Sequence, residues 1–274
     1  MRTLAPRRSL LAILVGVITL APARSEAQWT VKPGGWFMSN GFNVGTFPDR
    51  YSNTPGATGT ALDKRDWGMY FIYGWKDGLS VGLGQGYSHL EETRSGETTV
   101  TNGFTATGLF VMKRLAQGKG GILAIQPRID LPLFYDTEAR PVTGPVSADA
   151  EVRLLYGNGY GLLGKRGFVS TSAGVALWRA GADELRADLT VGLDALPKVL
   201  VMGQLFNVWG YEGGGLAYSA SKLGGSVVYK AAKGLGIQVG YAAGIAGQNT
   251  AREETWSLSI WLNHDAPDKF SGGK

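Results

Sequence analysis

The segment 184–194 alternates regularly between apolar and polar residues. Every odd-numbered residue in it is apolar, and every even-numbered residue except Gly192 is charged or hydroxylated. Because successive side chains of a β-strand point to opposite faces, a strand here has one apolar face and one ionic face. Soluble sheets also alternate, but charges in the middle of a strand are more typical of a wall between lipid and a water-filled lumen. The pattern therefore predicts a transmembrane β-strand.

The same two-residue period recurs along the rest of the chain, in segments separated by turn residues. The chain contains 42 Gly, 8 Trp and 11 Tyr, and no segment beyond the N-terminal region is apolar enough to form a membrane helix. The predicted fold class is an all-β, antiparallel up-and-down transmembrane β-barrel of about 12 strands, an even number as bacterial barrels require. Together with 184–194, the predicted strands are 34–44, 63–75, 79–90, 98–113, 121–133, 148–162, 167–179, 198–210, 216–230, 235–246 and 253–263.

The connections between these strands alternate in length and composition. One set is short and rich in Lys and Gly, which is typical of the periplasmic turns of such barrels. The other set includes the longest connections, 45–62 and 134–147, and is expected on the outer side, although 180–183 and 211–215 are brief. The short set comprises 76–78, 117–120, 164–167, 197–198 and 233–234.

Aromatic residues provide a second indication of contact with lipid. Trp67 and Trp75 share one face of their predicted strand, and Trp256, Ile260 and Leu262 share one face of the last strand. Aromatic girdles at membrane interfaces have this distribution. The alternative is that these rings fill a soluble core. A closed barrel is favoured because it satisfies every backbone group in lipid.

The N-terminal residues have the features of a secretory signal peptide. Arg2, Arg7 and Arg8 precede an apolar run over residues 10–20, and Ala27 ends a small-residue cleavage site. The apolar run is shorter than the roughly 20 residues that a membrane anchor needs, so we expect cleavage after Ala27. The predicted domains are then a signal peptide, residues 1–27, and a single barrel, residues 28–274, in which residues 264–274 form a polar tail.

The net charge of the expected mature chain is small. Removing the four arginines and one glutamate of residues 1–27 leaves 23 basic and 21 acidic residues, so the formal charge of +5 becomes +2. A nearly neutral chain gives no indication of a nucleic-acid partner. The chain has no cysteine, which excludes disulfides, thiolate metal sites and lipoprotein anchoring.

Strand parity brings charged residues of both signs to the inner face of the predicted barrel. Arginine holds carboxylates in a bidentate manner, so these residues are expected to pair along one wall. The paired charges could form a selectivity lining for a polar or amphiphilic solute, or a salt-bridge plug, because a barrel of this size can be open or filled. The predicted lumen-lining ionic wall comprises Gln126, Arg128, Asp130, Asp149, Glu151, Arg153, Glu184, Arg186, Asp188 and Lys222.

The opposite wall is predicted to carry small residues. Such residues could leave room for a narrow solute, although glycines could instead allow strong strand curvature. The residues concerned are Ser80, Gly82, Gly84, Gly86 and Ser88 on one strand and Thr101, Thr105 and Thr107 on the next.

Catalysis and metal binding have little support in the sequence. The two histidines, His89 and His264, are expected at opposite rims of the barrel. No serine, histidine and orienting polar residue can be placed together as a hydrolase needs, and the carboxylates are matched by arginines rather than grouped for a metal. We therefore expect no enzyme, no metal and no cofactor.

Three stretches resemble a known family. Residues 149–157 and 183–193, with 28–35 at the start of the expected mature chain, resemble the XagA-like outer-membrane proteins. That family is similar to outer-membrane barrels described as transporters of the phenol-degradation (MetA) pathway, and its namesake is associated with exopolysaccharide and biofilm gene clusters. The resemblance implies a single barrel linked to transport or polymer export. The positions of the XagA-like family that can be carried over to this chain are Glu151, Arg153, Glu184, Arg186 and Asp188. The resemblance implies no catalytic residue.

These inferences predict a monomeric barrel that lies in the lipid bilayer of a bacterial outer membrane and conducts a small-molecule or saccharide solute. A link to exopolysaccharide or biofilm export follows from the resemblance alone. The alternatives are a structural or adhesion-type barrel with a plugged lumen and, third, an outer-membrane lipid hydrolase.

Overall fold

The structure, a computed structural model, describes residues 30–51, 60–94, 96–134, 147–177, 183–211 and 217–264. The predicted signal peptide and the predicted tail after His264 lie outside the described residues. Within these ranges the chain forms thirteen β-strands. A search of the same ranges finds no helix with the length and apolar character needed to cross a membrane.

The strands have the following bounds. The first six are β1 (Trp36–Tyr51), β2 (Thr60–Lys76), β3 (Leu79–Arg94), β4 (Glu97–Phe104), β5 (Thr107–Gly118) and β6 (Gly121–Leu131). The other seven are β7 (Asp149–Leu162), β8 (Lys165–Leu177), β9 (Glu184–Leu196), β10 (Val199–Gly210), β11 (Tyr218–Ala232), β12 (Leu235–Gln248) and β13 (Thr250–His264).

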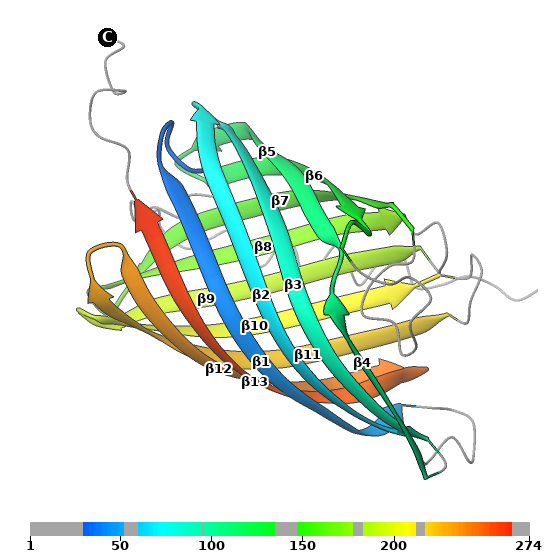
Figure 1. Ribbon diagram of the computed structural model, residues 1–274. Coiled ribbons are helices and arrows are strands. Elements are labelled where there is room, and N and C mark those ends of the chain that lie inside the picture. The colour runs from blue at the N-terminus through cyan, green and yellow to red at the C-terminus, as the bar shows by residue number, and fades with distance from the viewer. Residues whose placement is uncertain are drawn as a thin grey trace, which may run out of the picture.

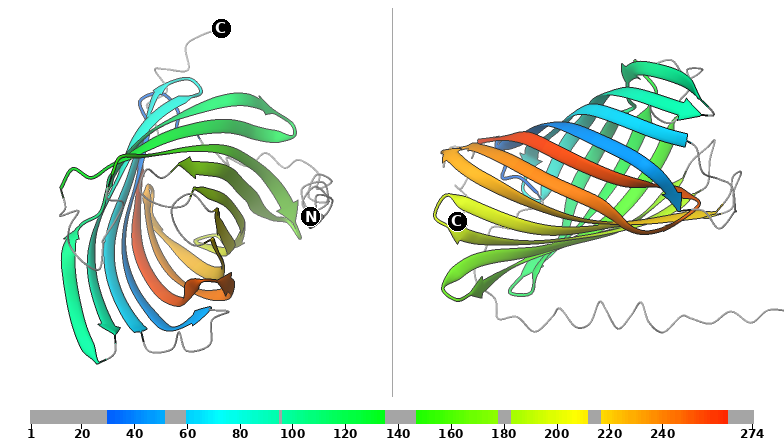
Figure 2. Two further views of the ribbon diagram at one scale, coloured as in Figure 1. Left: turned by 90° about the vertical axis from the view of Figure 1, so that its right-hand side faces the viewer. Right: turned by 90° about the horizontal axis from the view of Figure 1, so that it is seen from below.

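The strands form one closed antiparallel sheet. β1 pairs with both β2 and β13, and β2 pairs with β3, so the sheet has no free first or last strand. β4 and β5 lie one after the other along β3 and together supply one position in the wall. The barrel therefore has twelve wall positions, which confirms the predicted all-β, up-and-down architecture. Figures 1 and 2 show the inclined strands wrapped around a common axis.

The wall position shared by β4 and β5 contains one irregularity. Tyr87 of β3 pairs with Phe104, whereas Gly84 pairs with Gly108, so the β4–β5 side has one more residue over this interval than β3. An extra residue exchanges the inward and outward faces of a strand. Thr107, which was expected on the inner small-residue face, consequently lies on the outer face. The predicted strand 98–113 is right as one wall position and wrong as one continuous strand.

Two-residue turns join the strands at one end of the barrel. All five predicted short connections are confirmed. In the β7–β8 turn, Leu163 and Gly164 both have a positive φ, 52° and 75°, as a type I′ hairpin turn requires. At the other end β1 continues to Tyr51 and β2 begins at Thr60, so the predicted loop 45–62 is partly strand. The five turns are Asp77–Gly78, Lys119–Gly120, Leu163–Gly164, Pro197–Lys198 and Lys233–Gly234.

The outer face of the barrel is apolar. Large side chains point outward around the wall, including Trp75 (59% exposed), Trp256 (62%) and Leu258 (51%). A closed barrel leaves no backbone group unpaired toward lipid, and an apolar outer surface avoids placing charges in hydrocarbon. The protein is therefore a bacterial outer-membrane barrel, and the aromatic face predicted at Trp67 and Trp75 is its lipid-facing side.

Two apolar clusters lie on the inner face, toward the end with the short turns. The ring centroids of Phe37 and Trp261, one from each cluster, lie 5.8 Å apart in an edge-to-face contact. The segment 184–194 has an ionic inner face, so its alternation does not predict an apolar surface inside the barrel. The first cluster contains Ile72, Phe110, Met112, Ala124 and Leu155, packed against Val31, Phe37 and Tyr70, and the second contains Leu200, Met202 and Val228, packed against Phe168 and Trp261.

The described residues before β1 lie against the inner wall beside the first cluster. Val31 N donates to Ser80 Oγ (3.0 Å), and Gly34 N donates to Gly74 O (2.8 Å). Ser80 is fully buried, and a Cβ at Gly74 would lie 2.0 Å from Lys32 O. The segment 30–35 is therefore held inside the barrel, and its close approach requires a glycine at position 74.

Candidate functional site

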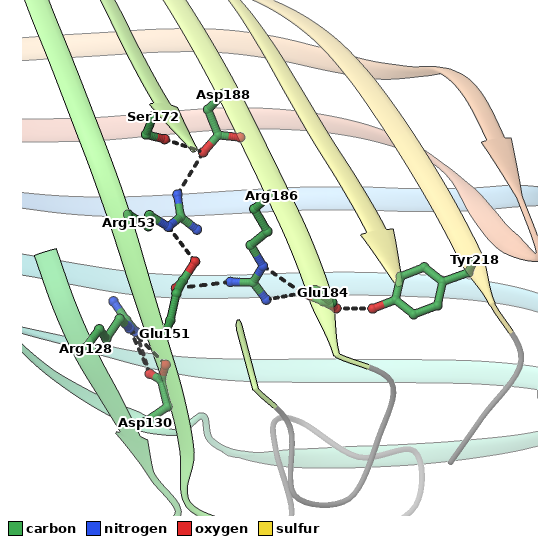
Figure 3. Close-up of polar contacts among 9 residues, drawn as sticks. All are labelled: Arg128, Asp130, Glu151, Arg153, Ser172, Glu184, Arg186, Asp188 and Tyr218. Atoms are coloured by element: carbon green, nitrogen blue, oxygen red, sulfur yellow. Dashed lines mark hydrogen bonds and ion pairs between the residues drawn. The ribbon is translucent and has the colours of Figure 1, made fainter. Parts of the chain in front are cut away.

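A band of charged side chains crosses the inner face of β6, β7 and β9 (Figure 3). Strand register places the charges together, because Arg128 of β6 lies opposite Glu151 of β7. The alternate residues of these strands point outward, for example Val152, which is 48% exposed on the lipid side. We call this band the ionic wall, and its members are Arg128, Asp130, Asp149, Glu151, Arg153, Glu184, Arg186 and Asp188.

Arg128 and Asp130 form a bidentate pair at the β6 edge of the ionic wall. Arg128 Nε donates to Asp130 Oδ1 (3.0 Å) and Oδ2 (2.9 Å), and Nη2 donates to Oδ1 (2.6 Å). A Cβ at Gly108 of β5 would lie 2.1 Å from Arg128 Nη2. The guanidinium therefore fills the space that this glycine leaves on the neighbouring strand. Asp149, which is buried, lies opposite Asp130 in the strand register.

Glu151 connects two arginines at the centre of the wall. Its Oε1 accepts from Arg153 Nε (2.5 Å), and its Oε2 accepts from Arg186 Nη1 (3.4 Å). Arg153 Nη1 continues the chain to Asp188 Oδ2 (2.8 Å), which also accepts from Ser172 Oγ (3.2 Å). Glu151 is only 5% exposed. A buried carboxylate of this kind is tolerated because each of its oxygens meets a guanidinium.

Glu184 ends the network on β9. Its Oε2 accepts from Arg186 Nε (2.6 Å), and its Oε1 accepts from the Tyr218 hydroxyl of β11. Sequence reasoning missed Tyr218. The available signal is its pairing with Gly210, because a Cβ at Gly210 would lie 2.3 Å from the Tyr218 ring. A large polar ring opposite a glycine indicates a side chain that lies flat across the neighbouring strand.

The ionic wall carries more negative than positive groups. Arg128, Arg153 and Arg186 pair with four carboxylates, so the ion-paired groups of the wall have a formal charge of −1 when all are ionised. The four carboxylates are Asp130, Glu151, Glu184 and Asp188.

The ionic wall borders a cavity of about 620 Å³ inside the barrel. Gln126, which was predicted as part of the wall, lines this cavity beside the charged residues. The cavity thus combines an ionic side with an apolar side, which suits a small solute that has both kinds of surface. The apolar lining consists of Val31, Phe37, Tyr70, Ile72, Met112, Leu155 and Phe206.

Lys222 lies apart from the other predicted wall residues. Its Nζ donates to Glu253 Oε2 (2.8 Å) beside a second cavity of about 280 Å³. Phe206 lines both cavities and lies between Asp188 and Lys222 in the strand register. The prediction of one continuous wall that includes Lys222 is therefore corrected, because an aromatic ring of β10 separates two groups of ion pairs.

Apart from Thr107, the predicted small-residue wall does face inward, but neighbouring side chains occupy the space beside the glycines Gly82 and Gly86. A Cβ at Gly82 would lie 2.2 Å from the Phe110 ring, and a Cβ at Gly86 would lie 2.8 Å from Thr105 Oγ1. Open space therefore does not account for these two glycines. They accommodate inward-pointing side chains of the next wall position.

The two histidines lie far from one another and from the ionic wall. His89 Nδ1 is 2.6 Å from Asn102 Oδ1 on the outer face near the end with the longer connections. His264 ends β13 at the short-turn end, and its ring stacks on Trp36 with 6.3 Å between centroids.

The overall fold is shared with solved outer-membrane barrels. No family model and no curated protein matches the chain. The COG4313 outer membrane channel from Pseudomonas putida F1 has a TM-score of 0.69 and 13% identity, over 88% of this chain and 100% of that chain. The beta domain of the Bordetella autotransporter BrkA has a TM-score of 0.52 and 18% identity, over 85% and 100%. At these identities the similarity establishes the fold alone.

Proposed function

We propose that the protein is an outer-membrane channel for a small solute and that the ionic wall lines its pathway. The observation that carries the proposal is the cavity of about 620 Å³ inside a closed barrel, bordered by paired charges on one side and apolar residues on the other. The P. putida protein with a similar fold is described as an outer membrane channel, which supports conduction rather than catalysis. In this proposal the chain is not an enzyme and uses no cofactor.

The excess of carboxylates sets the expected selectivity. A lumen wall whose ion-paired groups have a net formal charge of −1 attracts cations and repels anions, and the low-dielectric barrel wall strengthens the field. The apolar side of the cavity can at the same time contact an organic part of the solute. We therefore expect cations to pass more readily than anions of the same size.

Single-channel recording tests both points. The purified barrel in a planar bilayer is expected to give discrete current steps and, in a KCl gradient, a reversal potential that favours K⁺. Arg186→Gln removes one positive charge from the wall and is expected to raise the K⁺ preference. Arg65→Gln, on the exposed outer face of β2, is the matched control and should leave the reversal potential unchanged. The absence of current steps would contradict the channel, and an unchanged reversal potential in Arg186→Gln would contradict the lining role.

A second candidate function is a structural barrel whose lumen is closed. The segment 30–35 on the inner wall and the two apolar clusters favour it, because they occupy the short-turn half of the interior. Gly74→Ala places a methyl group against Lys32 O and should displace the segment without changing a charged residue. Current steps that appear only in Gly74→Ala would support a closed barrel, whereas equal conductance in both proteins would argue against a plug.

The identity of the solute and the monomeric state are finer parts of the proposal. A saccharide solute, and a link to exopolysaccharide or biofilm export, are supported only by the resemblance of 149–157 and 183–193 to XagA-like proteins. Deleting the gene and measuring surface polysaccharide tests the link. Unchanged polysaccharide with a loss of small-solute uptake would separate the channel from polymer export.

A further inference from the structure

We propose that the short-turn end of the barrel binds the phosphate groups of anionic phospholipids. We call this surface the turn rim and define it as the five two-residue turns with the strand residues next to them. The proposal concerns a surface outside the lumen, so it stands independently of the proposed channel function.

The turn rim carries an excess of exposed positive side chains. Asp77 belongs to this rim and is ion-paired with Arg114. Asp194 also lies near the rim, but it belongs to the inner face and pairs with Lys230 (2.6 Å) and with Arg166 (3.9 Å). Among the described residues, Lys119, Lys198 and Lys233 form no ion pair. The exposed cations of the rim are Lys76, Lys113, Lys119, Lys165, Arg166, Lys198 and Lys233.

Exposed apolar side chains place these cations at the boundary between lipid and water. Trp75 is 59% exposed, Leu196 is 60% exposed and Leu163 is 91% exposed. Lys76 Nζ lies 5.6 Å from the centre of the Trp75 ring. Aromatic and aliphatic side chains enter the acyl region, whereas neighbouring ammonium groups extend toward the headgroups. The rim cations are therefore at the depth of the lipid phosphates.

The opposite end of the barrel has the reverse charge. The described outward and rim residues there contain more carboxylates than cations, so the positive charge is concentrated at one end. Short turns face the periplasm in barrels of this class, and the adjacent leaflet consists of phospholipid. Charge complementarity therefore favours a phospholipid with a net negative headgroup over a zwitterionic one. Among the side chains that the structure describes at this end, the acidic ones include Asp63, Glu91, Glu92, Glu97 and Glu254, against Arg65 and Arg252.

Native mass spectrometry of the detergent-purified barrel tests the proposal. The protein is titrated with phosphatidylglycerol and with phosphatidylcholine that has the same acyl chains, and bound lipids are counted. We expect phosphatidylglycerol to bind more tightly. The triple variant Lys119→Gln, Lys198→Gln and Lys233→Gln should weaken its binding by at least about tenfold, since each basic residue near a membrane surface contributes attraction. The matched control, Arg65→Gln with Arg252→Gln, removes cations from the other end and should retain wild-type binding.

Three results would overturn the proposal. They are equal binding of the two lipids, wild-type binding by the triple variant, and displacement of phosphatidylglycerol by an equal concentration of inorganic phosphate, which would indicate a site for free phosphate. Heat-dependent migration on a gel confirms that each variant is folded. Current steps in a phosphatidylcholine bilayer do not depend on the turn rim. A failure of the lipid-binding proposal can therefore be distinguished from a failure of the channel proposal.

Discussion

The ionic wall and the apolar clusters line the same barrel but are stabilised in different ways. In the ionic wall, each arginine has a specific carboxylate partner at hydrogen-bond distance, and the cavity adjoins the charges. In the apolar clusters, side chains such as Ile72 (3% exposed) and Met112 (3%) are removed from solvent by close packing. The comparison shows that the interior of this barrel is not one uniform lining. The ionic wall supplies an electric field, and the apolar clusters narrow the interior of the barrel.

Glycines serve both parts in the same way. Gly108 leaves room for the Arg128 guanidinium, and Gly82 leaves room for the Phe110 ring. A missing side chain on one strand thus allows a large neighbour to lie across it. The small-residue positions are determined by the inward side chains that they accommodate, whether those side chains are charged or apolar.

The largest loss of stability is expected from Glu151→Gln. The amide keeps the shape of the side chain but leaves Arg153 and Arg186 without the negative charge that they share, which should cost about 3 kcal/mol. Urea unfolding in detergent micelles measures the change. Glu97→Gln, at an exposed position, is the control and should unfold like the wild type. A loss in Glu151→Gln no greater than in the control would show that the wall contributes little to stability.

Leu155→Ala tests whether the apolar part behaves as an ordinary protein core. Removing this buried side chain from the first cluster should cost about 2 kcal/mol in the same unfolding experiment. Leu154 is the matched control, because it directly precedes Leu155 in β7 and is 51% exposed on the outer face. Equal losses in Leu155→Ala and Leu154→Ala would mean that the inner cluster packs no better than the lipid-facing surface.

Tyr218→Phe should have an effect of intermediate size. The change removes one hydroxyl that donates to the buried carboxylate of Glu184 and should cost about 1.5 kcal/mol. Tyr229→Phe, an outward-facing residue that is 48% exposed, serves as the control. If the two variants unfold alike, the hydroxyl of Tyr218 does not contribute to holding the end of the ionic wall.

Phe206→Ala is expected to change stability least and conductance most directly. Its ring lines both cavities and is therefore only partly packed. Removing the ring should lower the free energy of unfolding by less than about 1 kcal/mol beyond the loss caused by a substitution at an exposed position. Because the ring separates Asp188 from Lys222, its removal should join the two cavities and raise the single-channel current. An unchanged current would place the conducting path away from β10.

Much of the fold was predictable because a membrane barrel imposes a strict period on each strand. The alternation in 184–194 correctly placed Glu184, Arg186 and Asp188 on the inner face, and the Lys- and Gly-rich connections correctly located all five short turns. The extra residue between β4 and β5 was not predictable from alternation. Thr107 follows the pattern of its own segment, and only pairing with β3 shows that the face has changed.

Apart from the wall position shared by β4 and β5, the sequence by itself determined which residues face lipid and which face inward, because parity is a local property of each strand and the outer face must be apolar in a bilayer. It did not determine which inward residues meet. Lys222 has the parity of the ionic wall, yet the ring of Phe206 separates it from Asp188, and the segment 30–35 reaches Gly74 and Ser80 across the interior. These contacts join residues that are distant in the chain, so they depend on barrel closure and strand register, which no local period specifies.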